Sequence, residues 1–78
     1  MELYPGLIVQ IDGYKGLAMI LVIFGDYVGC ELEGPFGDND GIHQGNRYFK
    51  CPPNCGVFVT HERVQRILNT EVITYLCS

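Results

Sequence analysis

Short runs of apolar residues, each ending at glycine or at a turn pair, set the pattern of the first half of the chain. Three of these runs predict β-strands, at residues 7–11, 17–24 and 27–33. The second run is apolar at every position, so we expect a strand that is buried on both faces. The alanine, methionine and leucine residues of this run are also compatible with a helix.

The second half predicts one long loop followed by two more strands. Residues 34–46 contain four glycines and little apolar content, which indicates a loop. In residues 47–51, Tyr48 and Lys50 alternate with Phe49 and Cys51, a period of two that favours a strand. Two prolines then break the pattern, and residues 56–60 predict the next strand.

The pattern changes after Thr60. Val64, Ile67 and Leu68 lie three and four positions apart, which is typical of a short amphipathic helical turn that Thr60 caps. Residues 71–76 are β-branched again and predict an edge strand. Many short strands between glycine turns imply an all-β fold, either barrel-like or sandwiched, in a single domain over residues 1–78.

Length and charge narrow the classes of partner. A chain of 78 residues makes one domain, and 47% hydrophobic residues suffice for a packed core. The net charge of -4 and five scattered basic residues argue against nucleic acid, since phosphates require clustered Lys and Arg. The apolar run at 17–24 is far shorter than the roughly 20 residues of a membrane span, so no membrane partner is expected. The first residues lack a positive segment, so we expect no signal peptide.

The four cysteines are expected to be free thiols in a reducing compartment. A disulfide framework would require a secreted context that nothing here indicates. Cys51-Pro-Pro-Asn-Cys55, with His43 and His61 nearby, suggests zinc, but no second closely spaced pair follows. We therefore expect neither metal nor cofactor. No local nucleophile motif accompanies the cysteines and histidines, so we expect no enzyme.

The most informative segment is the glycine loop, Gly37-Asp38-Asn39-Asp40-Gly41. Its glycines permit positive φ angles and close approach of a ligand backbone, while Asn39 and Asp40 favour Asx-turns that hold the loop rigid. A rigid glycine loop beside aromatic residues is suited to a peptide groove. It is unsuited to phosphate, because the glycine spacing of phosphate loops is absent and its two aspartates repel anions.

This loop and the residues after it resemble the CAP-Gly family signature, Gly-Lys-Asn-Asp-Gly-x3-Gly-x2-Tyr-Phe-x-Cys-x4-Gly-x-Phe-Val. The spacing matches throughout, with Asp38 in place of the usual lysine. Upstream, residues 27–32 are similar to the family's Trp-Val-Gly-Val-Glu-Leu strand, and downstream, residues 59–65 are similar to its Val-Arg-Pro-Ser-Arg-Val-Gln segment. The resemblance covers residues 7–67.

The resemblance implies a small SH3-like antiparallel barrel or sandwich that is cytoplasmic and cytoskeleton-associated. It also implies a ligand, the acidic C-terminal Glu-Glu-Tyr/Phe tail of tubulin, end-binding proteins or linker proteins. The family holds the terminal aromatic residue in an apolar cavity, while lysine and asparagine of the loop grip the acidic backbone. Carried over by position, the peptide-binding residues are Phe24, Tyr27, Gly37, Asp38, Asn39, Asp40, Gly41, Phe58 and Arg63.

Alternatives remain for several of these residues and for the ligand. Tyr27 and Phe58 also suit a core, Arg63 a solvated surface, and both histidines are expected at the surface. Asp38, together with Thr60 in place of a frequent arginine, weakens attraction to an acidic tail. Two alternatives to tail binding remain. The fold binds another protein ligand, or it serves as a structural or self-association domain that buries residues 64–76 against another chain.

Overall fold

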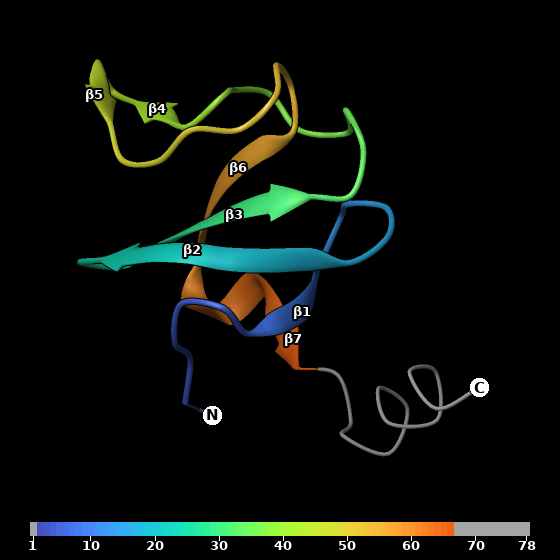
Figure 1. Cartoon of the computed structure of the whole chain (residues 1–78). Helices are drawn as coiled ribbons and strands as arrows, with labels where there is room; N and C mark the ends of the chain where they lie inside the picture. The colour runs from blue at the N-terminus through green and yellow to red at the C-terminus, as the bar shows by residue number, and fades with distance from the viewer. Residues whose placement is uncertain (1, 67–78) are drawn as a thin grey trace.

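A computed structural model describes residues 2–66, and strands dominate it (Figure 1). The strands in this part of the chain are β1 (Ile8–Ile11), β2 (Ala18–Phe24), β3 (Tyr27–Leu32), β4 (Ile42–His43), β5 (Asn46–Arg47), β6 (Gly56–Thr60) and β7 (Val64–Arg66). A single 3-10 turn, η1 (His61–Arg63), separates the last two of these strands. The all-β prediction is confirmed. No helix among the described residues is long and apolar enough to cross a membrane.

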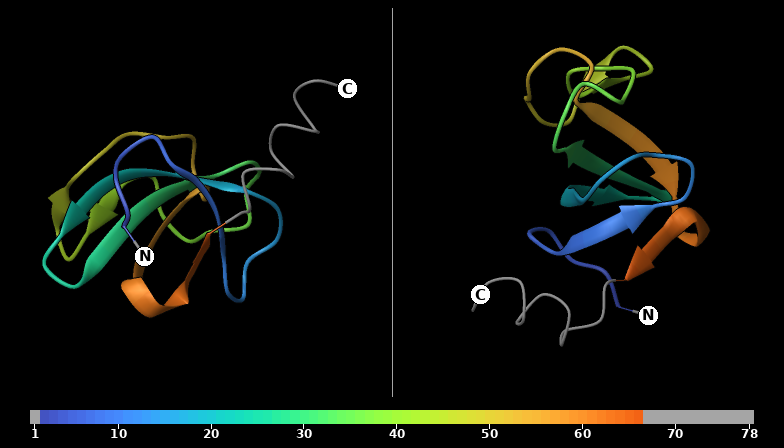
Figure 2. Two further views of the ribbon diagram at one scale, coloured as in Figure 1. Left: turned by 90° about the horizontal axis from the view of Figure 1, so that it is seen from below. Right: turned by 90° about the vertical axis from the view of Figure 1, so that its right-hand side faces the viewer.

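Five strands form one antiparallel sheet in the order β6-β3-β2-β1-β7, and β4 pairs with β5 in a separate hairpin. β3 lies between β2 and β6, with Tyr27 opposite both Phe24 and Thr60. The sheet does not close into a barrel, since β6 and β7 are its edges. Figures 1 and 2 show the β4–β5 hairpin beyond β3 and β6, and β1 and β7 at the opposite end of the molecule.

The core lies on one face of the sheet, as alternation along each strand requires. Its buried members are Val9, Ile11, Ala18, Ile20, Val28, Cys30, Leu32, Val57, Val59 and Val64. These small and β-branched residues suit the limited volume that a chain of this length can enclose. β2 is not buried on both faces, because the side chain of Met19 is 41% exposed, and that expectation was wrong.

A β-bulge at Leu21 changes which face β2 presents. Ile20 lies opposite Cys30 but Val22 lies opposite Gly29, so β2 has one residue more than β3 at this point. An extra residue reverses the alternation, and every later side chain changes face. Ile20 therefore faces the core, whereas Val22 and Phe24 face the opposite side.

The strand predicted at residues 47–51 is wrong beyond Arg47. The backbone N–H groups of Tyr48 and Phe49 both donate to the carbonyl of Gly41, at 2.9 and 3.4 Å, and Cys51 donates to Asp40 at 3.2 Å. The backbone N–H groups that would pair with a neighbouring strand are thus used to hold a loop. The residues with the alternating pattern therefore have no partner strand.

A helical turn does follow Thr60, but Val64, the first residue of the predicted apolar helical spacing, begins strand β7 instead. The turn follows Thr60 directly, occupies His61–Arg63, and receives no hydrogen bond from the Thr60 side chain. Val64 then begins β7, whose residues pair with β1, because the sheet edge provides backbone partners that a short helix lacks. Ile67, Leu68 and the edge strand predicted at 71–76 lie outside the described residues.

The cysteines among the described residues, Cys30, Cys51 and Cys55, are free thiols. Burial raises the pKa of the Cys30 thiol to about 12. Burial and then the carboxylate of Glu31 raise the pKa of Cys51 above its ordinary value. Both thiols are therefore protonated and weakly nucleophilic at neutral pH.

We expect Cys30 to resist iodoacetamide in the folded protein at pH 8 and to react fully in denaturant. At that pH a pKa near 12 leaves about one thiolate in ten thousand, and the buried sulfur is also inaccessible. Mass spectrometry of the alkylated protein measures this site by site. Modification of Cys30 at the same rate with and without denaturant would contradict the buried position of β3.

Candidate functional site

A cluster of aromatic rings lies on the face of the sheet opposite the core. β2, β3 and β6 each contribute one ring from positions that share this face, and the hairpin and the loop after it close over them. We call this set the aromatic cluster: Phe24, Tyr27, His43, Tyr48, Phe49 and Phe58.

The rings pack in geometries that aromatic side chains favour. Phe24 and Tyr48 stack in parallel, with centroids 4.0 Å apart and planes 3° apart. Phe49 and Phe58 lie 5.3 Å apart. Gly29 provides the space, because a Cβ there would lie 2.7–2.9 Å from side-chain atoms of Val22, Phe49 and Phe58. The third position of β3 must therefore be glycine for the rings to pack onto the sheet.

His43 is half-buried within this cluster, whereas the sequence predicted a surface position. Its ring centroid is 4.7 Å from that of Phe58 and 4.9 Å from that of Tyr27. The Nε2 atom is buried and has no hydrogen-bond partner among the described residues. The position of His43 could not be predicted from the sequence, since a two-residue strand shows no periodicity. His61 is exposed, as predicted.

The glycine loop is bound to the start of β6. The N–H groups of Asp38 and Asn39 donate to the carbonyl of Gly56 at 3.1 and 3.3 Å, and Gly56 donates back to the Asn39 carbonyl at 2.8 Å. The Asn39 side-chain oxygen accepts from the N–H of Gly41 at 2.8 Å. This is the Asx-turn expected for Asn39, and it leaves the loop rigid.

The glycines of this loop make room for the chain itself. Gly41 has φ +112°, and a Cβ there would collide with the carbonyl oxygen of Phe49. A Cβ on Gly37 would collide with the carbonyl oxygen of Gly56, although the φ of Gly37 is not positive. The expectation of positive φ holds for Gly41 and Gly45 and is wrong for Gly37. At Gly37 and Gly41 the close approach is made by this chain's own backbone.

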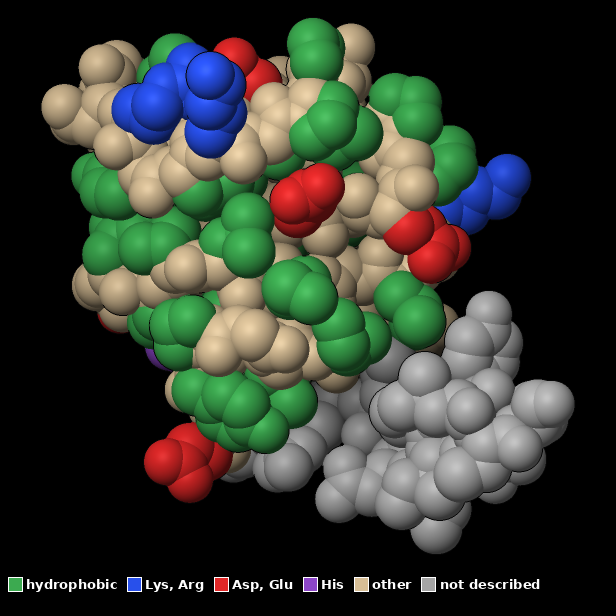
Figure 3. Space-filling model, in the orientation of Figure 1, with side chains coloured by type: hydrophobic (Ala, Val, Ile, Leu, Met, Phe, Trp, Pro, Cys, Tyr) green, Lys and Arg blue, Asp and Glu red, His purple; other side chains and the backbone are tan. Residues whose placement is uncertain are grey.

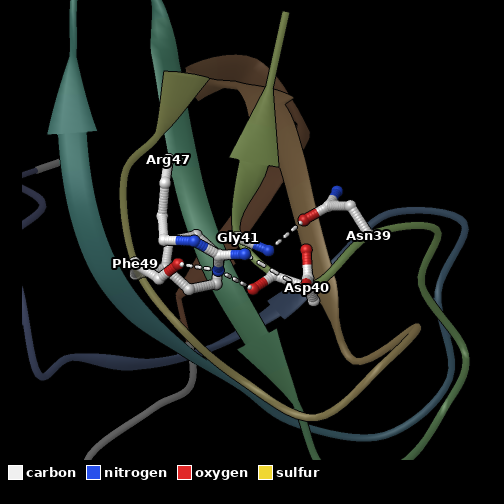
Figure 4. A network of polar contacts seen from close by, with 5 residues as sticks. All are labelled: Asn39, Asp40, Gly41, Arg47 and Phe49. Carbon is white, nitrogen blue, oxygen red and sulfur yellow. Dashed lines mark hydrogen bonds and ion pairs between the residues drawn. The ribbon is translucent and has the colours of Figure 1, made fainter. Parts of the chain in front are cut away.

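Arg47 ties the glycine loop to the aromatic cluster (Figure 4). Its Nη1 donates to the carbonyls of Asp40 and Phe49 at 3.0 and 3.1 Å, and its Nη2 donates to the Asp40 carboxylate at 3.2 Å. The role of Arg47 could not be predicted from the sequence, because a basic residue seven positions from an acidic one is informative only once the hairpin is known. Asp40, predicted to contact peptide, forms this ion pair, in which both side chains are 43% exposed.

The structure therefore unites most of the predicted site residues. Phe24, Tyr27 and Phe58 meet in the aromatic cluster and lie outside the core. Arg63 does not join them: its Nη2 donates to the carbonyl of Asp12 at 2.7 Å, and its guanidinium lies 5.5 Å from the ring centroid of Tyr14. It secures the turn after β1, at the opposite end of β6 from the glycine loop.

The surface chemistry of this region suits binding. Figure 3 shows hydrophobic side chains spread over one face of the molecule, with basic side chains at the upper left and at the right edge and isolated acidic ones among them. Asp38 is exposed, and its carboxylate accepts from the Asn39 amide at 2.7 Å. Across residues 2–66 no three His, Cys, Asp or Glu side chains are arranged to hold a metal ion. Aromatic faces beside a rigid polar loop are equipped to hold an extended peptide.

Comparison with known proteins gives consistent matches. The sequence model of the CAP-Gly domain family matches residues 10–64. Human CAP-Gly domain-containing linker protein 3 is 51% identical over 43 residues, 55% of this chain and 8% of the relative. Dynactin subunit 1 of Xenopus laevis is 41% identical over 59 residues, 70% of this chain and 5% of the relative.

The fold has a solved counterpart. The solution structure of the CAP-Gly domain in human kinesin-like protein KIF13B aligns with a TM-score of 0.75 at 33% identity, covering 86% of this chain and 72% of that one. The chain spans less than a tenth of the length of the linker and dynactin relatives.

Proposed function

The chain belongs to the CAP-Gly domain family, and from that premise we propose that it is a cytoskeleton-associated module that binds protein tails and catalyses no reaction. The observation that carries the proposal is the meeting of the aromatic cluster with the glycine loop. Three strands, the hairpin and the loop after β5 supply the rings, and Arg47 fixes the glycine loop beside them. A glycine loop that is already fixed in this way needs little further ordering when a ligand binds.

The ligand that we propose is an acidic C-terminal tail ending in Glu-Glu-Tyr or Glu-Glu-Phe, as on tubulin, end-binding proteins and linker proteins. Its last ring packs against Phe24, Tyr27 and Phe58, which are half-buried and present apolar surface. The Asn39 amide, already oriented by the Asx-turn, faces the tail's backbone from the loop.

Asp38 makes this binding weaker than the family's loop lysine would. An exposed carboxylate replaces a cation at the rim, so one attraction to an acidic tail becomes a repulsion. The net charge of -4 also removes long-range attraction. The same substitution supports a second candidate, a CAP-Gly fold retuned to another protein ligand.

We expect Asp38→Lys to strengthen binding of a Glu-Glu-Tyr peptide with a free carboxylate by about tenfold at low salt. The gain should shrink as salt rises, because exposed charges are screened over about 10 Å at 0.1 M. Fluorescence anisotropy of a labelled peptide measures both effects, and the carboxamide form of the peptide measures the part due to its terminal charge.

Glu62→Lys is the matched control, since it makes the same change of net charge at an exposed position on η1. It should give only the small gain that long-range attraction supplies. Equal gains from the two variants would show that position 38 does not face the tail, and would favour the retuned ligand.

A further inference from the structure

The aromatic cluster contains a buried polar atom that has no hydrogen-bond partner within residues 2–66. The Nε2 atom of His43 is buried, and no described residue offers it a hydrogen bond. Rings lie around the imidazole, and the centroids of Phe58, Tyr27 and Phe24 are 4.7, 4.9 and 5.9 Å from the centroid of the His43 ring. Buried polar atoms in folded proteins nearly always have a partner, so an exception of this kind indicates a missing one.

The surroundings decide what the missing partner is. A carboxylate or ammonium group placed among these rings would lose its hydration, at a far greater cost than a neutral hydroxyl. An imidazole nitrogen can accept from a hydroxyl or, in the other tautomer, donate to it. The partner is therefore a neutral hydroxyl carried on an apolar group that the rings accept, and a phenol meets both conditions.

We propose that His43 is a specificity-determining residue of the peptide site, where its Nε2 atom forms a hydrogen bond with the hydroxyl of a tyrosine at the end of the bound tail. The domain therefore binds tails that end in tyrosine more tightly than tails that end in phenylalanine. This inference rests on the proposed function, because it concerns the same cluster and the same ligand.

Access to Nε2 requires one ring of the cluster to move, and Tyr48 is the member that can. Its side chain is 37% exposed, and it follows β5 in a loop without a partner strand. Its stacking on Phe24 at 4.0 Å also demonstrates that a phenol ring packs flat against this surface. The ligand's ring takes that place, and its hydroxyl points toward His43, whose ring centroid lies 6.5 Å from that of Tyr48.

The test compares two peptides that share one acidic sequence and a free carboxylate and end in tyrosine or phenylalanine. We expect the parent chain to bind the tyrosine peptide about fivefold more tightly, the usual worth of one buried hydrogen bond. His43→Leu should reduce that ratio to about one, and His43→Gln, which places an amide near the Nε2 position, should restore part of it. The matched control is His61→Leu on the exposed η1 turn, which should leave the ratio unchanged.

The ratio separates a ligand contact from a merely structural role, since damage to the cluster would weaken both peptides alike. Equal affinity of the parent for the two peptides would overturn the role of His43 and leave tail binding intact. A ratio that survives in His43→Leu would likewise overturn it. Failure of the parent and of Asp38→Lys to bind either peptide would refute the proposed function, and with it this inference.

Discussion

Gly41→Ala is expected to destabilise the protein by about 3 kcal/mol or more. Two costs combine at this position. A φ of +112° is strained for any residue with a Cβ, and that Cβ would collide with the carbonyl oxygen of Phe49. The oxygen cannot simply withdraw, because Arg47 holds it at 3.1 Å. Thermal unfolding followed by circular dichroism should show a midpoint lowered by at least about 12 °C.

Gly45→Ala separates the two costs. Gly45 also has positive φ, at +83°, but nothing lies within 4 Å of the Cβ that it would gain. Only the backbone strain remains, so the loss should be about 1 kcal/mol. Similar losses at the two glycines would show that the approach of Gly41 to Phe49 is looser than the structure indicates.

Phe58→Ala should cost about 3 kcal/mol and abolish measurable peptide binding. Phe58 contacts four other members of the aromatic cluster, namely Phe24, His43, Tyr48 and Phe49. Its removal leaves a hole at the point where β6 and the loop after β5 meet, and the rigid sheet cannot collapse into it. Urea denaturation measures the stability, and peptide titration below the transition measures the binding.

Phe36→Ala is the comparison for the same change of side chain at an exposed position. Phe36 is 45% exposed in the loop before the glycine loop, so its loss should cost no more than about 0.5–1 kcal/mol. Phe58→Leu preserves most of the volume and should fold well while still weakening binding, because the ring face is gone. Normal affinity in Phe58→Leu would remove Phe58 from the proposed peptide surface.

The principal strands could be predicted from the sequence because each is decided locally. β-branched and aromatic runs between glycines identify β1, β2, β3 and β6 to within one or two residues, since turn chemistry and strand preference agree there. The short hairpin β4–β5 could not be found in the same way. Its two-residue strands form because Gly41, Asp40 and Arg47 bind the returning chain, and these contacts are not local in sequence.

The candidate site also has features that could be predicted from the sequence and features that could not. The rings of Phe24, Tyr27 and Phe58 were assigned by position in a resemblance, and the sheet register brings them together. Three features depended on tertiary contacts that no spacing indicates: the buried Nε2 atom of His43, the Arg47 hydrogen bonds, and the hydrogen bond of Arg63 to Asp12. The bulge at Leu21 is of the same kind, because an unbroken apolar run contains nothing that marks where its alternation reverses.

The bulge at Leu21 allows the interior and the proposed binding surface to be engineered separately. Before Leu21, Ala18 and Ile20 of β2 contribute to the hydrophobic interior, and beyond it Phe24 contributes to the proposed binding surface. Substitutions in the two sets touch few common neighbours, so their effects on stability should add. A library that varies Phe24, Tyr27, His43, Tyr48 and Phe58 can therefore be selected for new peptide ligands while the interior stays unaltered. Interior substitutions that raise stability can be introduced beforehand to offset the stability that changes in the aromatic cluster remove.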